Sequence, residues 1–190
     1  QTTDDGIGIE YLYDYDLRRI KTKYPTGGVS RTKYDPVGNV VKTIDPVRYD
    51  IKRDDGPGTQ YTYDEMNRLV MIKDPDGNVV KKYIYDIEGR LVKEIDTKGY
   101  LSADKDENRY GTIYKYNSAG WLTEKRVPVE KQSERILYNI TQYVYDKAGR
   151  RIEEKRSPEY VDENNFTQKW NVIFYSYDRN GRIVRISDST

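Results

Sequence analysis

One short motif recurs along the whole chain, and this recurrence restricts the fold more than any other feature. Its core reads Tyr-x-Tyr-Asp-x-x-Gly-Arg-Leu, and its copies begin at Tyr11, Thr32, Tyr61, Tyr83, Tyr114, Tyr143 and Tyr175. The second aromatic residues of successive copies are 21, 29, 22, 31, 29 and 32 residues apart. A catalytic motif normally occurs once, whereas a motif repeated at such a period indicates a structural unit.

Each copy predicts a β-hairpin. Aromatic and β-branched residues at alternate positions favour a pleated strand. The Asp then opens a four-residue turn by accepting hydrogen bonds from nearby backbone amides, and the Gly at the fourth position adopts a positive φ. This combination is typical of a type I turn followed by a G1 bulge. The repeat-defining residues are Tyr13, Asp14, Tyr34, Asp35, Gly38, Tyr63, Asp64, Tyr85, Asp86, Gly89, Arg90, Tyr116, Gly120, Tyr145, Asp146, Gly149, Arg150, Tyr177, Asp178, Gly181 and Arg182.

Some copies depart from the motif. Asn67 replaces the Gly of the third copy, and Asn117 replaces the Asp of the fifth. Asn tolerates the left-handed region that the Gly position of the third copy requires. The first copy places Leu17 in the Gly position, which predicts a turn that is strained or built differently. Trp121 occupies the Arg position after Gly120.

A second turn signal ends each return strand, as in Tyr24-Pro25-Thr26-Gly27-Gly28 and Asp74-Pro75-Asp76-Gly77-Asn78. Two strands and two turns in about 22 residues predict an all-β fold, a continuous antiparallel meander in a curved or spiralling open sheet. Residues 1–190 are expected to form a single array without a separate domain. Four insertions fall before Tyr strands, at 47–60, 100–113, 129–142 and 159–174. Those that end in the alternating apolar runs 135–140 and 170–174 predict longer strands.

Composition supports a sheet whose buried surface comes from amphipathic rings. The chain has 20 Tyr, 35% hydrophobic residues and a mean hydropathy of −0.99. A net charge of +1 with interleaved signs gives no case for nucleic-acid binding, and no apolar run is long enough for a membrane span. The absence of Cys and His excludes thiol chemistry, imidazole triads and the usual zinc ligands. Because the first residue is Gln1, we expect a piece of a longer protein.

The repeated Tyr-Asp with Gly-Arg-Leu shortly after it resembles the YD repeat of the RHS family, from Tyr11 to Asp188. The resemblance implies a ribbon of hairpins that coils into a hollow shell. Such shells belong to large secreted or cell-surface proteins: bacterial polymorphic toxins, the C component of insecticidal toxin complexes, wall-associated proteins and teneurins. In the bacterial toxins the shell encloses a variable C-terminal toxin domain.

The chain also departs from that family. A complete shell has many more repeats, so the resemblance implies that this chain is a segment of a larger β-shell. The family's autoproteolytic Asp-Pro-x-Gly-Leu core has no counterpart here. Asp35-Pro36-Val37-Gly38-Asn39 has Asn39 in place of Leu and forms the turn of the second repeat.

Each candidate site has a structural and a functional interpretation. The Tyr pairs are expected to stack across strands, with a carbohydrate-binding platform as the alternative. Trp121 and Trp170 interrupt the pattern and are the candidates for ligand contact. The turn residues Asp64, Asp86, Asp146 and Asp178 are expected to cap their turns. Calcium binding is the alternative to capping for these Asp residues, and also for the stretches 74–78 and 104–108. Neither stretch matches an EF-hand loop. No other cofactor is expected. Arg68, Arg90, Arg150 and Arg182 are expected to pair with an acid on a neighbouring hairpin or to stack on Tyr.

The sequence therefore predicts a non-catalytic structural segment of a secreted or cell-surface protein, most plainly a bacterial one. Its partners would be neighbouring repeats and an enclosed polypeptide cargo, and its exposed edge strands favour self-association. The alternative is a surface module that binds glycans or a protein through the insertion loops and exposed aromatic residues. A third interpretation is an enzyme such as a glycosidase, since carboxylates are abundant.

Overall fold

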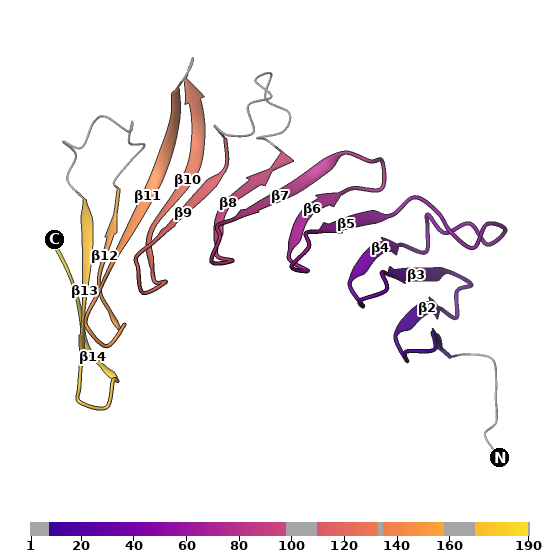
Figure 1. Ribbon diagram of the computed structural model, residues 1–190, viewed down its shortest axis with the longest axis horizontal. Coiled ribbons are helices and arrows are strands. Elements are labelled where there is room, and N and C mark those ends of the chain that lie inside the picture. Colours follow the sequence, from indigo (N-terminus) through magenta and orange to yellow (C-terminus); the bar gives the residue numbers. More distant parts are fainter. Residues whose placement is uncertain (1–7, 98–109, 133–134, 158–169, 190) are drawn as a thin grey trace. The chain divides into compact units, whose positions relative to one another are not determined.

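The computed structural model describes residues 8–97, 110–132, 135–157 and 170–189. These residues form fourteen antiparallel strands whose order in the sheet is their order in the sequence (Figure 1). The predicted all-β meander is confirmed. The chain divides into two compact units, residues 1–82 and residues 83–190, which we describe separately. None of the described segments is a helix long and apolar enough to cross a membrane.

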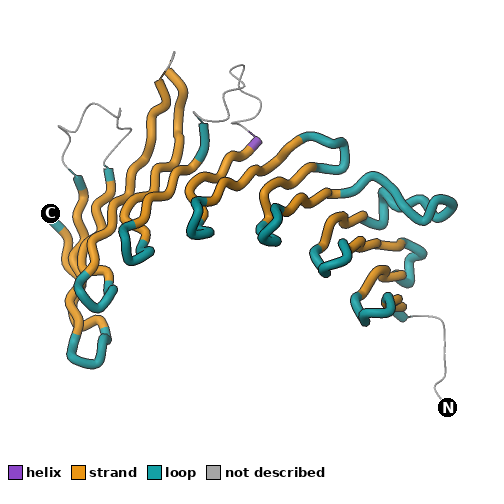
Figure 2. The backbone as a smooth tube through the Cα atoms, in the orientation of Figure 1, coloured by secondary structure: helices purple, strands orange, loops and turns teal. Residues whose placement is uncertain are grey.

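Each motif copy forms one hairpin, made of a Tyr strand and a return strand. The strands are β1 (Glu10–Tyr13), β2 (Arg19–Lys23), β3 (Val29–Tyr34), β4 (Val40–Ile44), β5 (Thr59–Tyr63), β6 (Leu69–Lys73), β7 (Val79–Tyr85), β8 (Leu91–Asp96), β9 (Thr112–Tyr116), β10 (Leu122–Gln132), β11 (Arg135–Tyr145), β12 (Arg151–Arg156), β13 (Asn171–Tyr177) and β14 (Ile183–Asp188). Figure 2 shows the loops and turns that join them.

The Tyr-Asp turns have the predicted geometry. In the β7–β8 hairpin the Asp86 amide donates to the Arg90 carbonyl and the Gly89 amide donates to the Asp86 carbonyl, both at 3.0 Å. Gly89 has a φ of 84°. Leu17 has a φ of 59° and its amide donates to the Asp14 carbonyl at 3.1 Å, so the first turn has the same construction with a non-glycine residue in the left-handed region.

A further irregularity follows six of these turns and was not predicted. In the β3–β4 hairpin Lys33 pairs with Lys42 and Tyr34 pairs with Val40, so Val41 is an extra residue on the return strand. The same shift occurs in the hairpins β1–β2, β5–β6, β9–β10, β11–β12 and β13–β14. Such a bulge interrupts the ladder of hydrogen bonds and increases the local twist.

The pairing gives the sheet two distinct faces. On the tyrosine face, the first aromatic residue of a hairpin lies opposite a residue of its return strand: Tyr11 opposite Thr22, Tyr61 opposite Ile72 and Tyr143 opposite Glu154. The residues between them point to the other side, which we call the opposite face. On the opposite face of unit 1, Lys21 pairs with Arg31 and Lys33 pairs with Lys42.

The buried core is small, as expected for a single sheet. Ile44 and Ile95 are each 1% exposed. Tyr138 and Ile140 form a cluster on β11, against which Ile113, Ile136 and Trp170 pack.

Two of the predicted strand extensions are confirmed. β10 and β11 are eleven residues each, and β13 begins at Asn171. The insertions predicted at 100–113 and 159–174 lie largely outside the described residues.

Candidate functional site

The turn Asp organises a compact polar network within its own turn. In the β11–β12 hairpin, Asp146 Oδ1 accepts the amides of Ala148 and Arg150 at 2.9 and 3.0 Å. Its Oδ2 accepts Arg150 Nε at 2.7 Å. The hydrogen bonds from the side chain and the backbone of Arg150 hold the pKa of Asp146 below its usual range. The same Asp–Arg ion pair, at 2.7–2.8 Å, joins Arg18 to Asp14, Arg68 to Asp64, Arg90 to Asp86 and Arg182 to Asp178.

The guanidinium held in this way extends over the next hairpin. Arg18 lies 5.0 Å from the ring centre of Tyr34, Arg90 lies 5.1 Å from that of Tyr116, and Arg150 lies 5.0 Å from that of Tyr177. Their Nη1 atoms donate to the carbonyls of the next turns at 3.3–3.4 Å, on Asp35, Asn117 and Asp178 respectively. The acid partner therefore lies in the Arg's own turn, whereas the sequence pointed to a neighbouring hairpin. The contact of Arg with a Tyr ring was predicted from the sequence. These three tyrosines contact an Arg and not the second Tyr that the stacking prediction named.

The Tyr hydroxyl completes the connection between hairpins. Tyr116 donates to the Leu91 carbonyl at 2.8 Å, at the start of the preceding return strand. Equivalent bonds of 2.7–3.2 Å run from Tyr34 to Arg19, Tyr63 to Val40, Tyr145 to Leu122 and Tyr177 to Arg151. In Arg19, Val40, Leu122 and Arg151 the acceptor carbonyl lies beside the bulge, where the ladder is interrupted, so the hydroxyl satisfies a group that the strand pairing serves poorly. We call the set of turn Asp, following Arg and next-hairpin Tyr the clasp.

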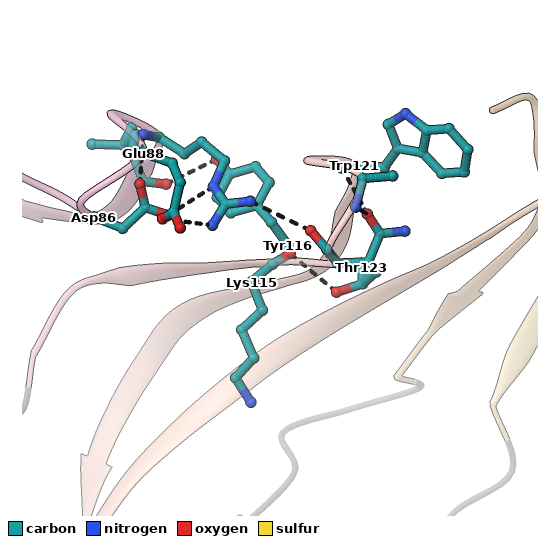
Figure 3. A network of polar contacts seen from close by, with 10 residues as sticks. Asp86, Glu88, Lys115, Tyr116, Trp121 and Thr123 are labelled. Atoms are coloured by element: carbon teal, nitrogen blue, oxygen red, sulfur yellow. Dashed lines mark hydrogen bonds and ion pairs between the residues drawn. The ribbon is translucent and has the colours of Figure 1, made fainter.

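The junction of β8 with β9 shows how the clasp is assembled. In Figure 3, Asp86 and Glu88 lie beside Tyr116, and Lys115 and Thr123 lie on the adjoining hairpin. Arg90 binds Asp86 Oδ2 at 2.7 Å and Glu88 at 3.2 Å. Thr123 Oγ1 donates to the Lys115 carbonyl at 3.1 Å.

Where the Arg of the clasp is replaced, the next turn carries a matching residue. Asn39 Nδ2 donates to its own Asp35 at 2.9 Å and to Asn67 of the next turn at 3.0 Å. Asn67 is the residue that replaces Gly in its own turn. The contact between turns is thus kept by a pair of substitutions.

Trp121 replaces Arg at the other irregular junction. Its ring centre lies 5.4 Å from that of Tyr145, at an angle of 46°. A Cβ added to Gly149 would lie 2.7 Å from the indole of Trp121. Trp121 is half-buried and therefore occupies the Arg position of the clasp with an aromatic contact.

A second polar cluster lies on the opposite face of unit 1, under the 45–58 loop between β4 and β5. The Asp54 carboxylate binds Lys21 at 2.6 Å and also contacts Arg31 and the Tyr49 hydroxyl. Asp55 binds Lys33 at 2.6 Å and Lys42 at 3.1 Å. The apolar side chains of this loop, Val47 and Ile51, are exposed, so charge holds the loop to the sheet.

This cluster offsets repulsion within the strands. Lys21 opposes Arg31 and Lys33 opposes Lys42, and like charges directly opposite on neighbouring strands are unfavourable. The hydrogen bonds from Lys21 and Tyr49, with Arg31 nearby, hold the pKa of Asp54 far below its usual range. Lys33 and the Gly56 amide do the same for Asp55. Both carboxylates therefore keep their charge to lower pH than an ordinary Asp does.

The other predicted sites have local structural partners. Asp74 Oδ1 accepts the amides of Asp76 and Asn78 at 2.9 Å, so it caps its own turn. Within the part of the chain that the structure describes, no group of three or more acidic side chains is placed to hold a metal ion. Trp170 packs beside Tyr138 and Ile140. The predicted calcium stretch 104–108 lies outside the described residues.

Removal of one clasp hydroxyl should weaken the sheet measurably. We expect Tyr116→Phe to lower the free energy of unfolding by about 1 kcal/mol, because it leaves the Leu91 carbonyl without its donor. Urea titration followed by circular dichroism measures this loss. The matched control is Tyr15→Phe, since the Tyr15 side chain is fully exposed. Equal stability of the two variants would contradict a role for the hydroxyl.

No protein-family model matches the sequence, and no curated protein matches it. Solved structures do match. The crystal structure of TcdB2–TccC3–Cdc42 is 17% identical, with a TM-score of 0.65 over 95% of this chain and 9% of that chain. The crystal structure of TcdB2–TccC3 is 16% identical, with a TM-score of 0.65 over 96% of this chain and 9% of that chain. The chain thus spans about a tenth of each solved chain. The fold predicted from the resemblance to YD-repeat proteins is confirmed, because the chain has the fold of one part of TcdB2–TccC3.

Proposed function

We propose that this chain is a non-catalytic wall segment of a larger β-shell that encloses a polypeptide. The observation that carries the proposal is the fold match, which covers 95% of this chain but only 9% of the solved chain. A chain that matches along its whole length to a small part of a much longer chain is suited to a structural role. We further propose that residues 1–190 act as one continuous array, in a secreted or cell-surface protein.

The mechanism of such a wall is steric. Every strand is paired with its neighbour in sequence, and the clasps tie successive turns together. We expect a wall built in this way to keep a protease or other partner out. The enclosed polypeptide would be shielded until the wall opens.

Protease protection tests this proposal. In the protein that carries the segment, the polypeptide that follows the repeats should resist digestion for as long as the wall is intact. Deletion of the hairpin from Tyr114 to Gln132 should expose it, whereas Tyr15→Phe should not. Equal digestion of the polypeptide in the intact protein and in the deletion variant would overturn the enclosure function.

A glycan-binding assay distinguishes an enclosing wall from the alternative function, a surface module that binds glycans. A surface module should bind specific glycans and lose that binding on Trp170→Ala. An enclosing wall should show protection and no such binding.

A further inference from the structure

A row of cations crosses the opposite face of unit 1. It runs over the three neighbouring strands β2, β3 and β4, and we call it the cation row: Lys21, Arg31, Lys33 and Lys42. Lys21 lies opposite Arg31, and Lys33 lies opposite Lys42. Each of these three strands is paired with a neighbour on both sides, so the cation row lies within the sheet and uses no sheet edge.

The cation row carries more charge than its own chain neutralises. Within the residues that the structure describes, its four cations contact two carboxylates, those of Asp54 and Asp55. Four cations against two carboxylates leave an excess of two positive charges. The cation row can therefore accept further negative charge.

Arg31 is also bound incompletely. It contacts Asp54 through Nη1, whereas its Nε is buried and has no hydrogen-bond partner among the described residues. A carboxylate that approaches a guanidinium side-on engages Nε and a terminal nitrogen together, and such paired hydrogen bonds are stronger than a single one. A different carboxylate would thus bind Arg31 better than Asp54 does.

The 45–58 loop, which supplies both carboxylates, is held to the sheet by charge. Its apolar side chains Val47 and Ile51 are 96% and 78% exposed, so they add little packing. Its backbone is closed on itself by hydrogen bonds between Asp50 and Asp55, at 2.7 and 3.4 Å. Partly exposed ion pairs contribute modestly one by one, so another pair of carboxylates can displace those of the loop.

We propose that the cation row is a binding site for an acidic polypeptide segment with neighbouring carboxylates, and that the 45–58 loop occupies this site in the unbound chain. The adjacent Asp54 and Asp55 show the ligand chemistry that the row accepts. An incoming segment displaces both, and one of its carboxylates binds Arg31 through Nε and a terminal nitrogen. The site goes beyond the proposed wall function and does not depend on it.

Spacing favours a peptide over a single small anion. Neighbouring strands lie about 4.8 Å apart, and residues two apart on one strand lie about 6.6–6.8 Å apart. The cationic side chains therefore start from backbone positions spread over an area that one small anion does not cover. An extended acidic segment, whose own side chains alternate at a similar spacing, brings several carboxylates to the row at once.

Trypsin reports whether an added peptide opens the loop. Arg53 is exposed in the 45–58 loop, and its cleavage rate follows the fraction of open loops. The probe is a peptide of residues 54–59, Asp-Asp-Gly-Pro-Gly-Thr with blocked ends, which trypsin does not cleave because it lacks Lys and Arg. At millimolar concentration it matches the effective concentration of a short tethered loop, so we expect cleavage of the unmodified chain to rise about five-fold.

Three controls distinguish a binding site from ionic screening. The same peptide with Asn in place of both Asp, and inorganic phosphate at equal ionic strength, should accelerate cleavage much less. In the Asp54→Asn, Asp55→Asn variant the loop is released beforehand, so its cleavage should not respond to the acidic peptide. No acceleration of the unmodified chain, or equal acceleration by the amide peptide or by phosphate, would rule out the site.

Direct binding locates the site on the cation row. A fluorescent form of the acidic peptide should bind the Asp54→Asn, Asp55→Asn chain about ten-fold more tightly than the unmodified chain, because the loop no longer competes. Arg31→Gln added to that chain should weaken binding about ten-fold. Arg179→Gln, which removes the same charge from an exposed position in the last turn, should not.

Fluorescence anisotropy measures these affinities, and circular dichroism confirms that the variants are folded. Equal affinity of the released and unmodified chains, or an Arg31→Gln chain that binds as tightly as the Arg179→Gln chain, would contradict the proposal. The trypsin test needs no substitution in the unmodified chain, so it decides the matter even where a variant does not fold. The protease test of enclosure is independent of both outcomes.

Discussion

Gly149→Ala is expected to lower the free energy of unfolding by about 2–5 kcal/mol. Two costs add at this position. Gly149 has a φ of 80°, a conformation that costs an alanine about 1–2 kcal/mol. The new Cβ would also lie 2.7 Å from the indole of Trp121, and relief of such a contact in a packed site costs a further 1–3 kcal/mol or so. Urea titration measures the total.

Gly120→Ala is the matched control for this change. Gly120 holds the same turn position in the neighbouring hairpin, with a φ of 82° and open space around an added Cβ. We expect this variant to lose only the 1–2 kcal/mol or so of backbone strain. The double variant Trp121→Ala, Gly149→Ala should recover part of the difference. Equal losses for Gly149→Ala and Gly120→Ala would show that Trp121 does not restrict the next turn.

Asp54→Asn with Asp55→Asn is expected to destabilise unit 1 by about 1–3 kcal/mol. The substitutions keep the shape of both side chains but remove the charges that offset Lys21, Arg31, Lys33 and Lys42. Since these pairs are partly exposed, each contributes modestly and the effect comes from the network. The loop should also open more often, so trypsin should cleave faster after the exposed Arg53.

Asp76→Asn is the control for the loop. Asp76 binds Arg48 of the same loop at 3.1 Å, but both side chains are well exposed, so we expect a loss below about 0.5 kcal/mol. Added salt should narrow the difference between the unmodified chain and the double variant, because screening weakens the cluster. A cleavage rate unchanged by the double substitution would mean that the carboxylates do not hold the loop.

The local chemistry of each turn was predictable from the sequence. An Asp four residues before an Arg, with a Gly between them, is enough to predict the β7–β8 turn. The long strands β10 and β11 were also predictable, since alternation continues through 135–140. These features depend on residues close together in the chain.

The clasp and the charged loop could not be predicted in the same way. The contact of Tyr63 with Val40 depends on the bulge, which shifts pairing by one residue and is not marked by a special residue type. Asp54 and Asp55 reach cations up to 33 residues away on three strands. A signal was present in the alternating cations Arg31 and Lys33, which need an acidic partner on the same face, but nothing in the sequence indicated which acid supplies it.

The limited reach of each clasp has a consequence for how such arrays change over time. A hairpin contacts the hairpin before it and the one after it, so stability is a sum of neighbouring terms. A whole Tyr-to-Tyr unit could be duplicated or lost by recombination at the cost of one junction. The pair Asn39–Asn67 restricts this freedom because both residues depart from the motif together, and Trp121 restricts it because its ring leaves no room for a side chain at Gly149. Units that carry such pairs should be inherited together, whereas units joined by Arg and Tyr remain interchangeable.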